Sequence, residues 1–269
     1  MPLIPISVLD DARLAPYRDL RQQNPTRQAR HFIAEGDKLV DRLLTSKYQT
    51  HSIFADEQYV AELQPRVPAG VPIYVAKRTL LEATIGFNFH RGCLACGVRE
   101  ARGALESWTP PAQAKWTIVA CPEVQDPTNL GTLLRNCAAF GVDLVLLGMK
   151  CADPFSRRVL RVSMGAVFEL SIVESPDLVS DLKALRERHQ VQSIATVLDR
   201  DAAELRQCSR PARCVLLFGN EGHGLTEAWA SFSDRRATIP MPPGTDSLNV
   251  AVASGIFLYH FTRVAPVES

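Results

Sequence analysis

The sequence predicts an α/β protein with two domains, the second of them built around a parallel β-sheet. From residue 116 to residue 219, short apolar runs alternate with stretches whose apolar residues recur at helical spacing. This alternation is typical of a parallel sheet with helices on both faces. The segment Ser107–Trp116 contains Pro110 and Pro111 among small and polar residues, so we expect it to link a domain 1–110 to a domain 111–269.

Composition and charge exclude several classes of protein. Hydrophobic residues make up 46% of the 269 residues and charged residues 22%, as in ordinary globular proteins. The formal net charge of +1 means that any surface for a polyanion must be a local patch. No apolar run is long enough to cross a membrane, and the N-terminus lacks the features of a secretory signal, so we expect a cytoplasmic protein without a membrane partner.

The seven cysteines are scattered and odd in number, which argues against a disulfide framework and fits a reducing compartment. Cys93 and Cys96 form a C-x-x-C pair preceded by His90, and such a pair could bind zinc or act in redox chemistry. No second pair follows, and the segment CLACGV is typical of a buried strand. We therefore expect no metal site and interpret both cysteines as core residues.

The first domain alternates helical and extended patterns and carries no catalytic cluster. Arg30–Leu44 has apolar residues at helical spacing, which predicts a helix. Residues 51–55 and 71–76 are expected to form strands, and residues 77–84 a helix. Five arginines near the N-terminus have few opposing acids: Arg13, Arg18, Arg21, Arg27 and Arg30. They indicate either a solvated helix face, which we favour, or an arm that contacts phosphate.

In the second domain we expect strands at residues 116–121, 143–148, 167–173, 193–198 and 213–219. Between the first two, the apolar residues of segment 130–141 share a face, which predicts a helix. Segment 248–261 is apolar nearly all round, which predicts a helix that is buried or covered by a partner subunit. Asp246 and Ser247 are expected to cap its N-terminus.

Three polar clusters follow predicted strands, where ligands bind in open parallel sheets. The first is Asp126–Arg135, in which Pro127 and Gly131 predict a turn and Asn129 could cap the next helix. Arg135 lies about one and a half turns further along. Arginine suits a phosphate, which it grips through two parallel hydrogen bonds, and a structural ion pair is the other interpretation.

The second cluster is LLFGNEGHGL, residues 216–225, a glycine-rich loop with Glu221 at its centre. Its glycines do not match the dinucleotide-binding pattern G-x-G-x-x-G, and no Lys-Ser or Lys-Thr follows as in a P-loop. A carboxylate would repel a pyrophosphate, so Glu221 indicates a ligand that is neutral or cationic where it meets the loop. The alternative is a tight turn whose glutamate caps the next helix.

The third cluster is ATIPMPPGTDSLN, residues 237–249. A predicted strand stops at Pro240, and a loop rich in proline and glycine leads into the last helix. Each cluster alone is a weak signal. The three clusters in this order, at one edge of one sheet, are together a strong indication of a ligand-binding site.

With these clusters, the sequence resembles the SpoU/TrmH family of RNA 2′-O-ribose methyltransferases, within the SPOUT superfamily. The matching stretches cover nearly all of residues 118–261: VQDPTNLGTLLRNCAAFGVDLVLL, DPFSRRVLRVSMGAVFEL, LLFGNEGHGL and IPMPPGTDSLNVAVASGIFLYH. The first domain more loosely resembles the family's L30e-like RNA-binding domain, through FIAEGDKLVDRLL and FNFHRG. Arg91 stands where the family often has Gln, Thr128 where Gly is common, and Ala251 where Ser is common.

The resemblance implies a SPOUT-type catalytic domain with a trefoil knot, a homodimer, and S-adenosylmethionine as a cofactor bound in a bent conformation. The implied cofactor-binding residues are Thr196, Gly219, Asn220, Gly222, Ile239, Met241 and Leu248. The implied catalytic residues are Asn129, Arg135, Glu221, Ser247 and Asn249. The implied substrate is RNA, with ribosomal RNA favoured over transfer RNA because of the N-terminal domain.

The implied reaction moves a methyl group from a sulfonium to a ribose 2′-hydroxyl, and some group must take the hydroxyl proton. The family often assigns this to the arginine that matches Arg135, yet a guanidinium is effectively always protonated. Our hypothesis is that Arg135 clamps the phosphate beside the target ribose. The proton acceptor stays open between that phosphate, water and Arg135.

Three alternative functions stay open: an RNA-binding protein of this fold that has lost methyl transfer, a methyltransferase that acts on a base, and a nucleotide-binding α/β enzyme. The intact catalytic set argues against the first, and the resemblance to the ribose-modifying branch argues against the second. The third is weakened because no phosphate loop carries a lysine.

Overall fold

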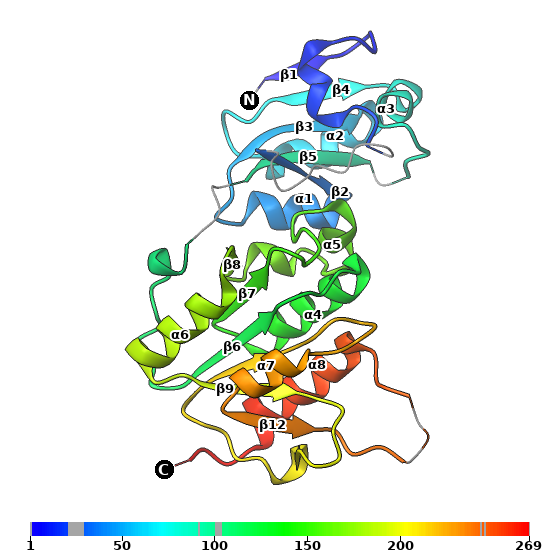
Figure 1. The fold of residues 1–269 in the computed structure, drawn as a ribbon. Helices are drawn as coiled ribbons and strands as arrows, with labels where there is room; N and C mark the ends of the chain where they lie inside the picture. Colours follow the sequence, from blue (N-terminus) through cyan, green and yellow to red (C-terminus); the bar gives the residue numbers. More distant parts are fainter. Residues whose placement is uncertain are drawn as a thin grey trace. The chain divides into compact units, whose positions relative to one another are not determined.

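The computed structural model describes residues 2–20, 30–90, 92–99, 104–242, 244 and 246–268. The chain forms two compact units (Figure 1). Unit 1 comprises Met1–Ala101 and Asp153–Glu169, and unit 2 comprises Arg102–Ala152 and Leu170–Ser269. The predicted division after residue 110 is therefore incomplete. The chain returns to unit 1 for segment 153–169, which we call the excursion.

Aromatic packing and an ion pair explain this excursion. The rings of Phe155 and Phe168 lie 5.1 and 5.6 Å, centroid to centroid, from the ring of Phe32 in unit 1. Arg157 donates a hydrogen bond of 2.8 Å to the buried carboxylate of Glu35. An arginine that pairs with a buried carboxylate removes the cost of leaving that charge alone.

The predicted strand over residues 167–173 is wrong in its first part. Ala166–Phe168 forms a 3-10 turn that begins after Gly165, whose φ is 79°. The apolar side chains of this turn are buried. These residues are apolar because they are buried, and not because they pair with another strand. The sequence pattern alone does not distinguish the two cases. The strand begins only at Ile172.

Within the described part of unit 1, five strands form one sheet in the order β1-β4-β3-β5-β2. Strands β1, β4 and β3 are parallel, and β5 is antiparallel to β3 and β2. The strands are β1 (Leu3–Pro5), β2 (His31–Glu35), β3 (Thr50–Asp56), β4 (Ile73–Ala76) and β5 (Cys93–Val98). The helices are α1 (Asp37–Leu44), α2 (Val60–Leu63), α3 (Arg78–Ile85) and α5 (Arg157–Val162).

The helix predicted over Arg30–Leu44 is wrong in its first half. His31–Glu35 pairs with β5 as a strand, and only Asp37–Leu44 is helical. Gly36 separates the two elements with a φ of 92°, a backbone conformation that favours glycine. The apolar residues on either side of this glycine happen to continue one helical spacing, which concealed the break.

Cys93 and Cys96 lie buried in β5 and are free thiols. Side chains three positions apart in a strand point to opposite faces of the sheet, so these two thiols cannot bind one ion together. Burial raises the pKa of both thiols to about 12. The two cysteines therefore act as small apolar core residues.

Two of the N-terminal arginines, Arg13 and Arg18, have local partners in the structure. Arg13 forms an ion pair with Asp11, and the hydrogen bond from its side chain lowers the pKa of Asp11 to about 2. Arg18 donates hydrogen bonds to the carbonyls of Leu9 and Asp11, at 3.2 and 2.9 Å. These contacts favour a structural role over a phosphate-binding arm. Arg21, Arg27 and Arg91 lie outside the described residues.

The described residues of unit 2 form one parallel sheet of seven strands in the order β10-β12-β9-β11-β6-β7-β8. The strands are β6 (Trp116–Cys121), β7 (Leu144–Gly148), β8 (Ile172–Ser175), β9 (Gln192–Thr196), β10 (Ala203–Glu204), β11 (Arg213–Leu217) and β12 (Arg235–Thr238). The helices are α4 (Pro127–Phe140), α6 (Leu178–His189), α7 (Glu227–Phe232) and α8 (Val250–Tyr259), and a π-helical turn (His260–Val264) follows α8.

Both faces of the unit 2 sheet are covered. Ile118 and Val215 pack with the leucines of α6 on one face, and the alternate residues Val119 and Leu216 are also buried. Burial of both faces explains why these strands read as continuous apolar runs. Helices α4 and α8 lie side by side, joined by hydrogen bonds from the Asn136 amide to Ala251 and Ser254 (Figure 1).

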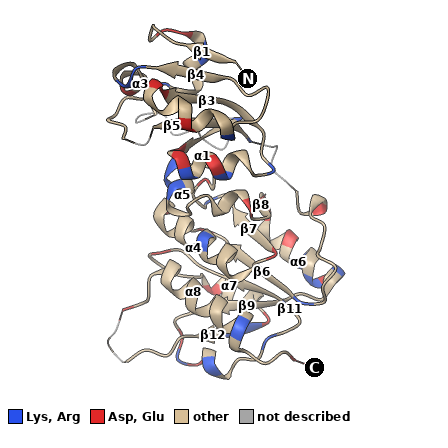
Figure 2. Cartoon of the chain, turned by 180° about the vertical axis from the view of Figure 1, so that it is seen from behind, with Lys and Arg blue, Asp and Glu red and all other residues tan. Residues whose placement is uncertain are grey.

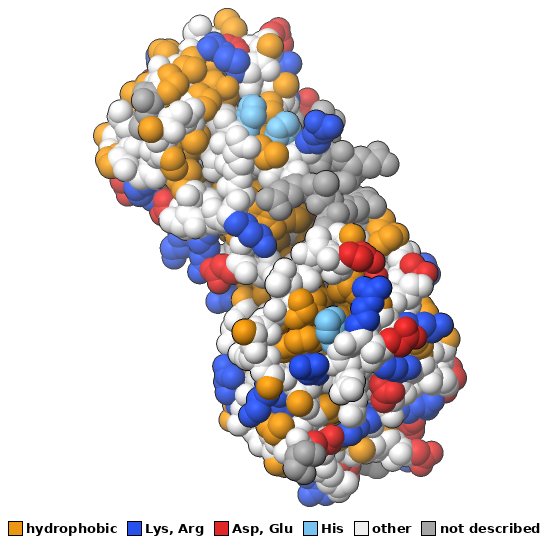
Figure 3. All heavy atoms as spheres, turned by 90° about the vertical axis from the view of Figure 1, so that its left-hand side faces the viewer, with side chains coloured by type: hydrophobic (Ala, Val, Ile, Leu, Met, Phe, Trp, Pro, Cys, Tyr) orange, Lys and Arg blue, Asp and Glu red, His pale blue; other side chains and the backbone are white. Residues whose placement is uncertain are grey.

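Charged side chains are mixed in sign over the molecule. In unit 2, basic and acidic side chains alternate over the face seen in Figure 3, in keeping with the small net charge. Helix α8 carries no charged residue, as its tan colour in Figure 2 shows. None of the helices among the described residues combines the length and apolarity needed to span a membrane.

Candidate active site

The parallel strands of unit 2 bring three loops to one edge of the sheet. The loops at residues 122–126, 218–226 and 239–249 follow β6, β11 and β12. A fourth loop follows β9, and its strand is joined to β11 by a hydrogen bond of 2.7 Å from the Thr196 hydroxyl to the Leu217 carbonyl. Because all these strands are parallel, the loops at their carboxyl ends form one site.

The loop after β11 closes on itself. Asn220 and Gly224 exchange main-chain hydrogen bonds of 3.0 and 2.9 Å, and Gly224 has a φ of 67°. A Cβ on Gly219 would lie 2.2 Å from the carbonyl carbon of Gly224, so only glycine allows this closure. The Asn220 side chain accepts from Gly222 N and donates to the Glu123 carbonyl, which ties the loop to the one after β6.

Glu221 does not cap the helix that follows it. Its carboxylate accepts hydrogen bonds from the main-chain N–H groups of Gln125 and Asp126, at 3.2 and 2.9 Å, and from the Asn129 amide at 3.3 Å. These donors belong to the turn and first residues of α4. The alternative interpretation, in which Glu221 caps the next helix, is therefore wrong: its main-chain donors, Gln125 and Asp126, lie in the turn before α4.

Asn129 and Asn249 connect the first and third loops. The Asn249 amide donates a hydrogen bond of 2.8 Å to Asn129 Oδ1, while Asn249 Oδ1 accepts from Ala251 N and Val252 N at the start of α8. Glu221, Asn129 and Asn249 thus form one hydrogen-bonded chain across all three clusters. We call it the Glu221–Asn129–Asn249 chain.

Two predicted caps are corrected by this geometry. The cap of α4 is Asp126, whose carboxylate accepts from Thr128 N and Asn129 N at 2.8 and 2.9 Å. The cap of α8 is Asn249 in place of Asp246 or Ser247. The side-chain oxygen of a cap accepts hydrogen bonds from backbone N–H groups. Because Asp126 and Asn249 have this role, the predicted caps Asn129 and Ser247 do not use their oxygens for capping.

Arg135 lies on α4 and is exposed. Within the part of the chain that the structure describes, its side chain has neither a hydrogen-bond nor an ion-pair partner. The structural ion pair considered as an alternative is therefore not present among those residues. An exposed arginine without a partner keeps its full bidentate donor capacity for an anionic ligand.

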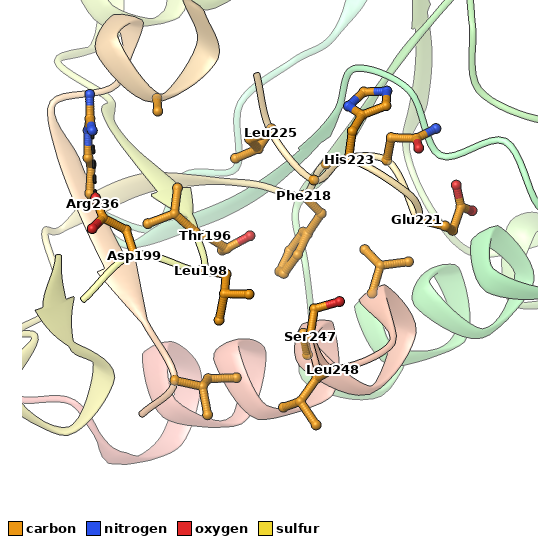
Figure 4. A pocket seen from close by; sticks show the side chains of 18 of the residues that line it. Thr196, Leu198, Asp199, Phe218, Glu221, His223, Leu225, Arg236, Ser247 and Leu248 are labelled. Atoms are coloured by element: carbon orange, nitrogen blue, oxygen red, sulfur yellow. Dashed lines mark ion pairs between the residues drawn. The ribbon is translucent and has the colours of Figure 1, made fainter. Parts of the chain in front are cut away.

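A pocket of about 530 Å³ lies between the loops that follow β9, β11 and β12 (Figure 4). It is lined by all the predicted cofactor-binding residues, Thr196, Gly219, Asn220, Gly222, Ile239, Met241 and Leu248. Of the predicted catalytic residues, Glu221 and Ser247 also line it. Asn129 is hydrogen-bonded to the pocket residue Glu221, and Asn249 is hydrogen-bonded to Asn129. Arg135 is not among the residues that line the pocket.

Comparison with known proteins identifies the family. A model of the SpoU rRNA Methylase family matches residues 117–259, more than half of the chain. The chain belongs to this family. The resemblance found in the sequence is thereby confirmed.

Relatives of this SpoU family member cover almost its whole length. An uncharacterized tRNA/rRNA methyltransferase of Mycobacterium bovis is 36% identical over 94% of this chain and 90% of its own. The 23S rRNA (guanosine(2553)-2′-O)-methyltransferase RlmP of Bacillus subtilis is 27% identical over 92% of this chain and 95% of its own. The structure of an AdoMet-bound rRNA methyltransferase from Sinorhizobium meliloti has a TM-score of 0.83 and 27% identity, covering 97% of this chain and 98% of that one. The predicted α/β fold with a parallel sheet is confirmed.

The charges around the pocket of this SpoU protein distinguish it from a phosphate site. Among the described residues, its lining contains three carboxylates, on Asp199, Glu221 and Glu227, but one arginine, Arg236, and no lysine. An excess of negative charge attracts a cation and repels a phosphate. The carboxylate at the centre of the glycine loop therefore belongs to a pocket that is acidic as a whole.

Sequence reasoning missed several residues of the pocket. Phe218 is buried under it and packs edge-on against Phe257 of α8, with ring centroids 6.0 Å apart. Leu198, Asp199 and Arg236 also line the pocket. Phe218 could have been found from its place directly before Gly219. Nothing in the sequence marks Asp199 and Arg236, because their meeting depends on the pairing of β9 with β12.

Proposed function

We propose that this protein transfers a methyl group from S-adenosylmethionine to a ribose 2′-hydroxyl of ribosomal RNA. The observation that carries the proposal is the Glu221–Asn129–Asn249 chain, which joins three loops beside an acidic pocket; α4, which carries Asn129, also carries Arg135, an exposed side chain without an ion-pair partner among the described residues. Support also comes from the B. subtilis and S. meliloti relatives, which are named rRNA methyltransferases.

The residues of the pocket fit the proposed cofactor. Its volume of about 530 Å³ lies within the range of small-molecule sites, and its lining combines apolar side chains with main-chain groups at strand ends. The excess of carboxylates suits a positively charged ligand. When bound, S-adenosylmethionine supplies an electrophilic methyl group on a cationic sulfur.

The chain's own residues have positioning roles in this proposal. Methyl transfer needs the acceptor oxygen in line with the methyl carbon and its leaving group, and such alignment can supply several kcal/mol, up to roughly 7–11 in ideal cases. Glu221 and Asn249 hold the loops that shape the pocket. Arg135 clamps the phosphate beside the target ribose through its two parallel donors.

Ser247 and Asn129 complete the proposed catalytic set. Ser247 lines the pocket and presents a hydroxyl to the cofactor and the ribose. Asn129 holds the turn before α4 by its contact with Glu221. The proton of the 2′-hydroxyl then passes to the clamped phosphate or to water.

Nucleotide-resolution mapping of 2′-O-methylation tests this function. Purified protein and S-adenosylmethionine are incubated with unmodified rRNA and, in parallel, with unmodified tRNA. We expect one new 2′-O-methyl site, in rRNA. A site in tRNA alone would replace the substrate, and cofactor binding without any new site would favour an RNA-binding protein that has lost transfer.

We also propose that unit 1, with residues 1–110 as its main part, is an L30e-like RNA-binding domain, and that unit 2, which holds most of residues 111–269, is a trefoil-knotted catalytic domain. Support for the knot is that the chain leaves β12 near one edge of the sheet and returns through α8 to α4. An experimental backbone trace that becomes a straight line when its ends are pulled apart would contradict the knot. Because rRNA is the proposed substrate, we place the protein in the cytoplasm.

We propose that α8 forms a homodimer interface. Val252, Ile256 and Tyr259 on this helix are 53%, 40% and 55% exposed, although the helix carries no charged residue (Figure 2). An apolar helix face needs a cover, and a second copy of the chain supplies one.

Sedimentation equilibrium should give about twice the chain mass of 29.7 kDa, and Val252→Asp should shift the protein toward monomer, because a buried unpaired charge is costly. An acid near a helix N-terminus is compatible with folding, so the monomer should stay folded. Val179→Asp, at an exposed apolar position of α6, is the matched control and should leave the mass unchanged. A monomeric wild-type protein would refute the proposal.

A further inference from the structure

The pocket of unit 2 has two polar ends. Figure 4 shows Glu221 at one end, Asp199 and Arg236 at the other, and Thr196, Leu198 and Phe218 between them. The proposed function accounts for the Glu221 end only. The Asp199–Arg236 end has no role in it.

Asp199 has one carboxylate oxygen engaged and one available. Its Oδ1 accepts a hydrogen bond of 2.9 Å from Asp201 N, which closes the turn after β9 and fixes the side chain. The nearest basic group to Oδ2 is Arg236 Nη1, at 3.8 Å. This separation is too long for a direct hydrogen bond. The Asp199 side chain lines the pocket and is 35% exposed, so a ligand in the pocket can reach it.

Arg236 is held from its other side. Its Nη2 donates to Glu227 Oε1 at 2.6 Å and to Ser231 Oγ at 3.3 Å, both on α7. The main chain of Arg236 is opposite Ala195 in the pairing of β12 with β9, which places it near the loop that carries Asp199. The guanidinium is therefore fixed with Nη1 on the side of Asp199.

This pair of groups suits hydroxyls better than an anion. A hydroxyl both donates and accepts, so it can donate to Asp199 Oδ2 and accept from Arg236 Nη1. Arg236 already has Asp199 and Glu227 within 3.8 Å, and a third carboxylate or a phosphate would face both of these acids. An acidic side chain that binds ribose hydroxyls is the arrangement found in dinucleotide sites.

We propose that Asp199 and Arg236 bind the ribose hydroxyls of the cofactor's adenosine, at the end of the pocket away from Glu221. The inference rests on the proposed function, which requires the methyl group to lie near the groups that face RNA. Arg135, which faces RNA in that function, is on α4, and Asn129 of the same helix is hydrogen-bonded to Glu221. The adenosine therefore extends toward Asp199 and Arg236, and this pair discriminates adenosine from its deoxy analogues.

Isothermal titration of the full chain with S-adenosylhomocysteine and with its 2′-deoxy and 3′-deoxy analogues tests the pair. The wild-type protein should bind at least one deoxy analogue about tenfold or more weakly than the parent, the value of one hydrogen bond to a charged group. The affinity of the Asp199→Asn variant for the parent should fall by a similar factor relative to the wild type. Its affinity for that deoxy analogue should equal that of the wild type. Asparagine keeps the turn, because its Oδ1 still accepts from Asp201 N, but its second atom no longer accepts from a hydroxyl.

Asp201→Asn is the matched control, since it removes the same charge from the same loop without touching the pocket, and it should bind all three ligands as the wild type does. 5′-Methylthioadenosine, which lacks the amino acid, should also lose affinity in Asp199→Asn. If it does not, the pair faces the amino acid and the proposal is wrong. Equal binding of the parent and both deoxy analogues would likewise overturn it. Failure of the wild-type chain to bind S-adenosylhomocysteine at all would overturn the proposed cofactor and this pair with it.

Discussion

An RNA that carries a deoxyribose at the mapped target nucleotide should receive no methyl group. The proposed acceptor is the 2′-hydroxyl itself, so its removal leaves no atom to attack, whereas a base methyltransferase would be unaffected. The same RNA should still bind, with affinity within about tenfold of the parent, because a single neutral hydrogen bond is worth about 0.5–1.5 kcal/mol. Transfer of radiolabelled methyl groups and a filter-binding titration measure the two quantities separately.

The control is an RNA with a deoxyribose at the neighbouring nucleotide, which should be methylated normally. The 2′-hydroxyl is also the group by which proteins distinguish RNA from DNA, so binding alone cannot replace the transfer assay. Methylation that persists on the deoxy target would refute ribose chemistry and favour transfer to a base.

Replacement of Arg135 by alanine should lower methyl transfer on the order of 10²-fold or more, as loss of a donor aimed at developing or fixed negative charge does in other enzymes. Arg135→Lys should be nearly as slow, since an ammonium group cannot reproduce two parallel hydrogen bonds to a phosphate. Single-turnover kinetics over a range of pH measure the effect. The melting temperature should not change, because Arg135 is exposed and its side chain forms no hydrogen bond or ion pair with the described residues.

Two comparisons make this result specific. Arg188→Ala removes another exposed arginine, on α6, and should retain full activity. Titration with S-adenosylhomocysteine should give wild-type affinity for both Arg135 variants, because Arg135 does not line the pocket. Near-normal turnover of Arg135→Lys would contradict the clamp and leave Arg135 with a role that a point charge can fill.

The sequence predicted the strands of unit 2 well and those of unit 1 unevenly. The run WTIVAC became β6 with the predicted bounds, because burial on both faces produces an uninterrupted apolar signal. HFIAE and DKLVDRLL in unit 1 read together as one helix, and the pairing of the first with β5 could not be seen locally. Segment 153–169 was assigned to the wrong unit because Phe155 and Phe168 pack on a residue more than 100 positions earlier.

The candidate site, too, could be predicted from the sequence only in part. The residue types and spacing of LLFGNEGHGL and IPMPPGTDSLN were sufficient for the family, and all seven predicted cofactor-binding residues line one pocket. The caps of α4 and α8 were assigned to neighbouring polar residues, because several candidates for each cap stand side by side and only backbone geometry selects one of them.

By itself the sequence determined the chemical groups available to this protein: a glycine-rich loop, a central carboxylate unsuited to phosphate, and an arginine on a helix. Only the tertiary structure decided what those groups contact. Glu221 meets the turn before α4 from 95 residues away, and Asp199 meets Arg236 across two strands that are not consecutive in the chain. Hydrogen bonds act over about 3 Å in space and are indifferent to separation along the chain, so their partners follow from the order of the strands in the sheet.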